Sequence, residues 1–128
     1  MSSRDRPSSP LVLVVDDDDD ARELYGAAFE RKGYRVATAS DGEAALARVS
    51  DERPDAILMD VAMPGMDGIE ATRRLKSKPS TADIPVVVVT AQGTQSVLAE
   101  LHTIGADAVV RKPCAAGELL ALVERILS

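Results

Sequence analysis

The sequence is poor in the residues that build several common kinds of functional site. It has one cysteine, Cys114, so we expect neither a disulfide framework nor a cysteine-based metal site. It has no tryptophan, two tyrosines and one phenylalanine, which argues against a flavin site and against a surface that stacks on nucleic-acid bases. The hydrophobic core must therefore be built from aliphatic side chains.

Positive charge and long apolar runs are also scarce. The chain has 15 lysines and arginines against 21 acidic residues, a net charge of −6, so we expect no direct nucleic-acid partner and no membrane partner. No apolar run approaches the roughly 18 residues that a membrane span needs. Residues 1–10 lack the apolar segment of a secretion signal, and we therefore predict a cytoplasmic protein.

What remains is a chain of one domain's length, with 128 residues of which 45% are apolar. Residues 1–10 are polar, which predicts a disordered leader before a domain over 11–128. Five short aliphatic runs follow, each succeeded by a segment with apolar residues at helical spacing. They cover residues 11–15, 34–39, 56–59, 86–89 and 108–110. This alternation predicts an α/β fold, a five-stranded parallel sheet doubly wound with five helices.

Several local signals refine this prediction. Asp18 or Asp19 can cap the first helix, and Ser40 with Glu43 has the spacing of a capping box before the second helix. The basic residues on the third helix are expected to form an ordinary solvated face: Arg73, Arg74 and Lys76.

Polar side chains follow four of the five predicted strands where each strand ends. They are Asp16 and Asp17, Asp60, Thr90, and Lys112. Taken singly, each has an ordinary explanation as a helix cap, a β-former or a solvated lysine. In a parallel sheet, however, all carboxyl ends meet at the edge where ligands bind, so their coincidence predicts a shared site.

The chemistry of these groups is mutually consistent. Three carboxylates close together repel one another unless a cation lies among them, and Mg²⁺ suits an all-oxygen set of ligands. A carboxylate nucleophile beside Mg²⁺ is an arrangement for phosphoryl transfer. Lys112 could supply a cation to phosphoryl oxygens and Thr90 a hydroxyl donor.

In these features the sequence resembles the receiver domain of two-component response regulators, which has a flavodoxin-like fold. The similar segments cover residues 13–17, 58–68, 88–91 and 109–113. The resemblance implies that Asp60 accepts a phosphoryl group, with Thr90 as the switch hydroxyl and Lys112 as the phosphoryl-binding lysine. It also implies a Mg²⁺ site held by the following groups: the acidic pair Asp16 and Asp17, Asp60, and the backbone carbonyl of Ala62.

The resemblance further implies a signalling domain rather than an enzyme, although one that assists its own phosphorylation and dephosphorylation. Its phosphodonor would be a sensor histidine kinase or a histidine phosphotransfer protein, and its downstream partner an unknown protein. We expect a stand-alone receiver, with its Lys112–Pro113 bond cis as in the family. The aromatic switch residue of the family falls at Val109, so we expect a smaller conformational signal at the surface.

Two alternatives stay open at this point. A haloacid-dehalogenase-like phosphatase also uses an aspartate nucleophile, Mg²⁺, a hydroxyl and a lysine, and Asp16 to Asp18 formally matches its first motif. A degenerate receiver would bind a partner without being phosphorylated.

Overall fold

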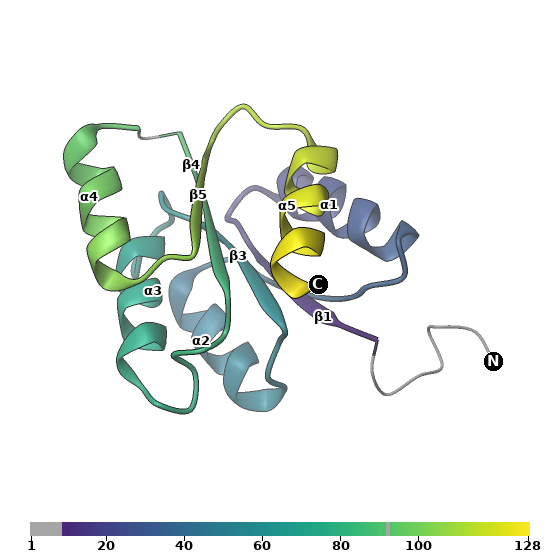
Figure 1. Ribbon diagram of the computed structural model, residues 1–128, viewed down its shortest axis with the longest axis horizontal. Helices are drawn as coiled ribbons and strands as arrows, with labels where there is room; N and C mark the ends of the chain where they lie inside the picture. Colours follow the sequence, from purple (N-terminus) through teal and green to yellow (C-terminus); the bar gives the residue numbers. More distant parts are fainter. Residues whose placement is uncertain (1–8, 92) are drawn as a thin grey trace.

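The computed structural model describes residues 9–91 and 93–128, in which strands and helices alternate (Figure 1). The strands are β1 (Leu11–Val15), β2 (Arg35–Ala39), β3 (Ala56–Asp60), β4 (Val86–Thr90) and β5 (Ala108–Arg111). The helices are α1 (Asp19–Arg31), α2 (Gly42–Asp51), α3 (Gly68–Ser77), α4 (Gln95–Ile104) and α5 (Ala116–Leu127). Within the described residues, no helix combines the length and the hydropathy that crossing a membrane requires.

The five strands form one parallel sheet in the order β2-β1-β3-β4-β5, which confirms the predicted fold class. β1, β3 and β4 are buried along their whole length, as expected for continuous aliphatic runs at the centre of such a sheet. β1 and β3 are neighbours, with Val15 opposite Met59. This register brings the residues that follow β1 close to the end of β3.

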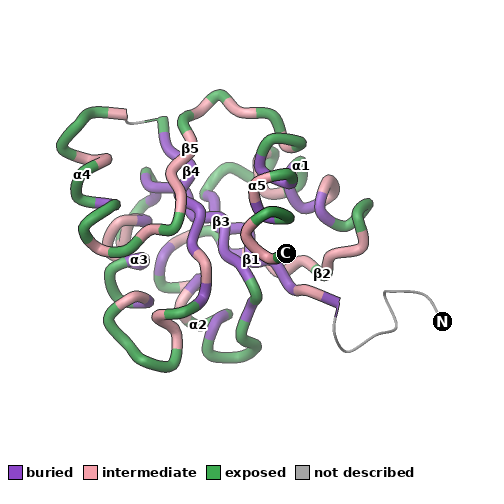
Figure 2. The backbone as a smooth tube through the Cα atoms, in the orientation of Figure 1, coloured by how far each residue is buried: buried purple, intermediate pink, exposed green. Residues whose placement is uncertain are grey.

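Alternate residues of each strand supply two separate cores. One face of the sheet packs against α2, α3 and α4 through residues such as Leu13, Ile57 and Val88. The other face packs against α1 and α5 through residues such as Val14 and Leu58. Figure 1 shows the sheet between these two groups of helices, and Figure 2 shows burial concentrated along the central strands.

Side-chain caps start four of the helices, and they correct one prediction. Asp18 caps α1 by accepting the N–H of Asp20, so the first of the two predicted candidates, Asp18 and Asp19, is the cap. The predicted capping box at Ser40 is wrong, because Asp41 is the cap of α2 and accepts the N–H of Ala44 at 2.8 Å. The remaining two capping residues are Asp67 on α3 and Thr94 on α4.

The first part of the chain leads directly into the sheet. Residues 1–8 of the predicted leader lie outside the described residues. Ser9 is buried, and its carbonyl accepts a hydrogen bond from the Arg35 side chain at 3.2 Å. The carbonyl of Pro10 accepts the backbone N–H of Arg35 at 2.9 Å. These contacts extend the pairing of β1 and β2 by one step before Leu11.

Acidic side chains close the amino-terminal edge of the sheet. Asp55 accepts the N–H of Leu11 at 2.7 Å, and Asp107 accepts the N–H of Val86 at 2.7 Å. Lys76 reaches Asp107 at 2.8 Å and also donates to the carbonyls of two residues in the loop after α3. The prediction of a solvated face is therefore wrong for Lys76, whose side chain is 11% exposed.

Candidate functional site

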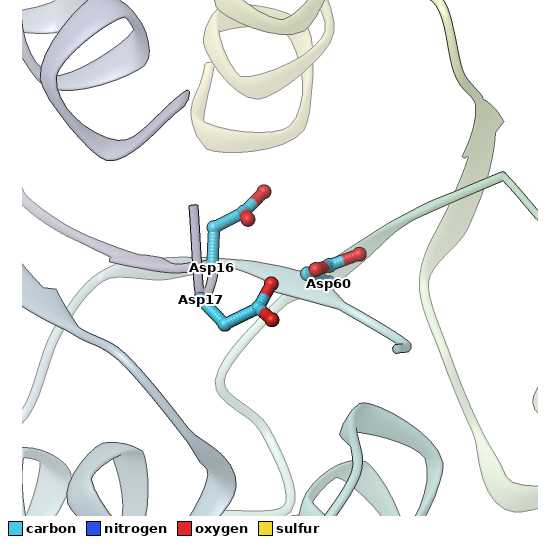
Figure 3. A group of neighbouring side chains, drawn as sticks. All are labelled: Asp16, Asp17 and Asp60. Carbon is cyan, nitrogen blue, oxygen red and sulfur yellow. The ribbon is translucent and has the colours of Figure 1, made fainter. Parts of the chain in front are cut away.

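Three carboxylates meet at the carboxyl edge of the sheet. Asp16 and Asp17 follow β1 directly, Asp60 is the last residue of β3, and one oxygen from each lies within 4.8 Å of the others. Figure 3 shows the three side chains next to one another beyond the ends of their strands. Asp16 and Asp60 are buried, whereas Asp17 is exposed. The site therefore has two interior acids and one that faces solvent.

The turn after β3 holds the backbone of Asp60 in place. Gly68, the first residue of α3, donates its N–H to the carbonyl of Val61 at 2.9 Å. A Cβ at this position would lie 1.9 Å from the carbonyl oxygen of Asp60, so no larger residue fits there without moving the backbone. Gly65, in the same turn, has a φ of 71°, which favours glycine. The glycines that follow the strand thus allow α3 to start against Asp60.

Lys112 enters the same site from the end of β5. Its ammonium group lies 3.1 Å from Asp16 Oδ2 and 3.3 Å from Asp60 Oδ1. Its backbone N–H donates to the carbonyl of Thr90 at 2.8 Å, and the bond from Lys112 to Pro113 is cis. One lysine therefore bridges the two buried carboxylates.

The electrostatics of the site disfavour a fully ionised set of acids. Burial, reinforced by the nearby charge of Asp16, raises the pKa of Asp60 from 3.8 to about 6, against the opposing effect of Lys112. Burial lowers the pKa of Lys112, but contact with Asp16 and Asp60 outweighs it and raises that pKa overall. The single lysine does not compensate the negative charge completely.

These residues suit a hard divalent cation. The three acids offer only oxygen ligands, and Mg²⁺ typically takes one or two carboxylates together with phosphate oxygens and water. The raised pKa of Asp60 indicates that additional positive charge would stabilise its ionised form. Ala62, two residues after Asp60, is exposed in the turn after β3, so its backbone is near the site in the chain.

Thr90 and Val109 lie on the neighbouring strands. Thr90 ends β4 and is fully buried. It is the register partner of Arg111, and Val88 is the partner of Val109, so these four residues share one face of the sheet. Val109 is partly buried against the core beneath α2, α3 and α4. The Arg111 guanidinium lies over Gly93, because a Cβ on that glycine would be 2.3 Å from Arg111 Nε.

Sequence reasoning missed two side-chain contacts near the site, of which the first supports the acidic loop. Arg22 donates to the backbone carbonyl of Asp16 at 2.6 Å and pairs with Asp19, three residues before it on α1. The spacing of Asp19 and Arg22 could have indicated this pair. The Tyr25 hydroxyl lies 3.8 Å from Cys114 Sγ, and burial followed by this contact raises its pKa to about 12. No periodicity in the sequence indicates that second contact.

Comparison with known proteins identifies the class of this fold and site. The family model of the response regulator receiver domain matches residues 12–124 of the sequence, so the chain belongs to this family. It is the receiver domain of a response regulator, as in two-component signalling. This class consists of signalling modules, and the comparisons do not favour the phosphatase alternative.

Curated relatives include two kinds of regulator. The chain is 38% identical over 116 residues to the phosphate regulon transcriptional regulatory protein PhoB of Pseudomonas aeruginosa, covering 91% of this chain and 51% of that protein. It is 40% identical over 116 residues to the response regulator MprA of Mycolicibacterium vanbaalenii, covering 91% of this chain and 49% of that protein. The chain thus spans about half the length of the curated relatives it matches.

Solved structures agree with this assignment. The chemotaxis protein CheY4 of Vibrio cholerae superposes with a TM-score of 0.88 at 31% identity, covering 94% of this chain and 100% of that one. The receiver domain of a signal transduction histidine kinase from Syntrophus aciditrophicus gives 0.86 at 33% identity, covering 92% and 89%. The fold of this chain is therefore shared with receivers from several protein contexts.

Proposed function

We propose that this receiver accepts a phosphoryl group on Asp60 from a phosphohistidine, in a reaction that requires Mg²⁺. The observation that carries the proposal is the position of Asp60, a buried carboxylate at a strand end within 4.8 Å of two other acids and in contact with Lys112. The P–N bond of the phosphohistidine breaks as a P–O bond to the Asp60 carboxylate forms, and the electron pair leaves on the imidazole nitrogen.

Each neighbour of Asp60 has a role in this proposal. Asp17, Asp60 and the backbone carbonyl of Ala62 would hold Mg²⁺, with Asp16 as the second acid of the pair. When bound, Mg²⁺ supplies charge neutralisation to the phosphoryl oxygens. Lys112 now divides its contacts between Asp16 and Asp60, and in the proposal its ammonium group binds the incoming phosphoryl group. The Thr90 hydroxyl would donate to the same group.

The partners follow from this chemistry. The phosphodonor would be a sensor histidine kinase or a histidine phosphotransfer protein. A downstream protein would then dock to the phosphorylated form of this chain. Phosphorylation replaces the single charge of Asp60 by roughly −1.5 to −2 and adds acceptor oxygens. It shifts an existing conformational equilibrium only by the free energy of the new contacts. With a valine at 109, the shift at the surface is expected to be small. The cytoplasm, where both donors would act, is the proposed location.

The test uses acetyl phosphate and Mg²⁺ with the full chain. Intact-mass measurement is expected to detect one added phosphoryl group that is absent in Asp60→Asn and without Mg²⁺. Asp51→Asn is the matched control, because Asp51 is an exposed acid at the end of α2, and it should be phosphorylated like the unmodified chain.

Other outcomes separate the alternatives. An adduct that maps to Asp16 would indicate the phosphatase chemistry, and the absence of any adduct would indicate a receiver that works without phosphorylation. Either result would contradict the role proposed for Asp60.

A further inference from the structure

A cavity of about 500 Å³ opens away from Asp60, between the helices that precede β3 and β4. The helices α2 and α3 lie side by side (Figure 1). The residues that line the cavity come from the carboxyl-terminal parts of these two helices and from the loops that follow them. Its volume falls within the range of about 300–1,000 Å³ for small-molecule sites. Its lining consists of Leu46, Val49, Ser50, Arg53, Arg74, Leu75, Ser77, Lys78, Ser80 and Thr81.

The lining divides into an apolar part and a cationic part. Leu46, Val49 and Leu75 supply aliphatic surface from the facing sides of α2 and α3. Arg53, Arg74 and Lys78 supply three cations, and no acid is among the described residues that line the cavity. Arg53 and Arg74 pair with Asp83 and Glu70 outside the lining, so Lys78 is the cation without an ion pair in the described part of the chain. The residues that line the cavity are thus basic, although the whole chain has a net charge of −6.

Donors remain available on these cations. Arg53 uses Nε for the carbonyl of Ser80 at 3.4 Å and one terminal nitrogen for Asp83, and Arg74 uses Nε for Glu70 at 2.9 Å. The second terminal nitrogen of Arg53 and both terminal nitrogens of Arg74 have no partner within residues 9–91 and 93–128. Lys78 also makes no ion pair there. An incoming anion would therefore not have to break existing pairs.

The wall of the cavity is held in place by the protein itself. Thr81 donates its hydroxyl to the carbonyl of Leu75 at 2.6 Å, and Ala82 donates its N–H to the carbonyl of Lys78 at 2.8 Å. The hydrogen bond from Arg53 to the carbonyl of Ser80 connects the loop after α3 to the segment that follows α2. A preformed wall lowers the ordering cost of binding.

Helix capping accounts for only part of this arrangement. A cation in the last turn of a helix stabilises the negative end of its dipole, which explains Arg74 on α3. Arg53 lies beyond the end of α2 and bonds to the loop instead. Capping also requires no aliphatic hollow beside the charges.

We propose that this cavity binds a small amphiphilic anion, a phosphate or carboxylate group on a short apolar body. The apolar body would cover Leu46, Val49 and Leu75, and the anionic group would take hydrogen bonds from Arg74 and Lys78. The charge complementarity of the lining selects the anion, and the aliphatic surface selects an occupant larger than a simple inorganic ion. The site is independent of phosphorylation at Asp60.

The first experiment compares four probes on the isotopically labelled full chain without Mg²⁺. Amide shifts are followed during titration with hexyl phosphate, hexanoate, hexanol and inorganic phosphate. Hexyl phosphate is expected to shift the amides of residues 49–50, 75–78 and 80–81 to saturation, with an affinity at least about tenfold above those of hexanol and inorganic phosphate. Hexanoate then distinguishes a carboxylate preference from a phosphate preference. Hexyl phosphate binding no tighter than inorganic phosphate, or shifts centred elsewhere, would overturn the proposal.

A pair of variants tests the cations. Arg74→Ala with Lys78→Ala should weaken hexyl phosphate at least about tenfold. Arg31→Ala with Arg125→Ala removes the same charge from exposed positions outside the lining and should leave the affinity within about twofold. Equal losses in both pairs would overturn the proposal.

Folding and phosphorylation are controlled separately. If the first pair fails to fold by thermal melting, Lys78→Ala alone carries the test, because Lys78 is exposed and unpaired among the described residues; unchanged affinity in that variant would contradict the proposal. Asp60→Asn should bind hexyl phosphate like the unmodified chain, so failure of the phosphorylation proposal leaves this result unchanged.

Discussion

The two edges of the sheet both carry aspartates, but they use them in opposite ways. At the amino-terminal edge, Asp55 and Asp107 each accept a backbone N–H at the start of a strand. At the carboxyl edge, Asp16, Asp17 and Asp60 crowd together around one lysine. The comparison teaches that an aspartate stabilises the fold where its charge is compensated, whereas incomplete compensation marks the candidate site.

The amino-terminal edge is compensated from several directions. Asp107 holds both the N–H of Val86 and the ammonium group of Lys76, which also binds the carbonyls of Ala82 and Ile84. This network joins α3, the loop after it and the start of β4. At the other edge the raised pKa of Asp60 means that the folded state opposes ionisation, a cost that functional sites often retain.

The largest expected effect comes from breaking the compensated edge. Asp107→Ala removes the partner of a strand N–H and of the largely buried Lys76, and should lower the free energy of unfolding by about 2–4 kcal/mol in urea titration. Asp51→Ala removes an exposed acid whose side chain makes no hydrogen bond among the described residues, and should change the free energy of unfolding by less than about 0.5 kcal/mol. Equal effects would mean that the network contributes nothing.

Removing a charge from the other edge should have the opposite sign. The pKa of Asp60 is about 6 in the folded chain against an ordinary 3.8, so between these values the folded state holds a proton that the unfolded state releases. Stability therefore falls as pH rises through this window, and the loss persists above it. Asp60→Asn without Mg²⁺ should raise the free energy of unfolding by about 1–2 kcal/mol at neutral pH, and by less near pH 4.

The control for that prediction is an acid from the amino-terminal edge. Asp55→Asn weakens the hydrogen bond to Leu11 and should destabilise the chain at neutral pH. If both substitutions destabilise equally, the contrast between the edges is wrong.

Mg²⁺ should stabilise the folded chain by neutralising charge at the carboxyl edge, and we expect this effect on the free energy of unfolding to be somewhat smaller. A ligand at tenfold excess over its Kd stabilises the folded state by about 1.4 kcal/mol, measured as a rise in Tm at constant ionic strength. Asp17→Asn should abolish this rise, because Asp17 belongs to the group of three acids. Asp19→Asn, in the same run of aspartates but outside that group, should retain it. Retention in both variants would place the cation elsewhere.

Much of the fold and the grouping of acids followed from the sequence. Five aliphatic runs alternating with helical periodicity leave few arrangements other than a covered parallel sheet, and the strand ends then share an edge. Asp60 follows an apolar run and precedes a Pro-Gly turn, and this pattern predicted that it lies at the end of a strand, at the shared edge. The roles of the site residues came from resemblance and stay proposals.

Contacts made by long side chains across loops could not be predicted. Lys76 lies on the helix face that periodicity assigns to solvent, but the loop after α3 folds over it and supplies carbonyl acceptors. Ser40 and Asp41 can both cap a helix, and only the backbone conformation decides between adjacent positions. Arg22 reaches a backbone carbonyl, which has no sequence signature.

The smallest expected effect asks whether an uncompensated polar group costs stability away from either edge. Thr72, on the buried face of α3, is fully buried, and its hydroxyl has no hydrogen-bond partner in the described part of the chain. Thr72→Val keeps the shape and removes the hydroxyl, so it should raise the free energy of unfolding by about 0.5–1 kcal/mol. Thr103→Val on the exposed side of α4 should give no such gain. A loss at Thr72 would show that its hydroxyl is satisfied in solution, and then only the carboxyl edge would carry uncompensated polarity.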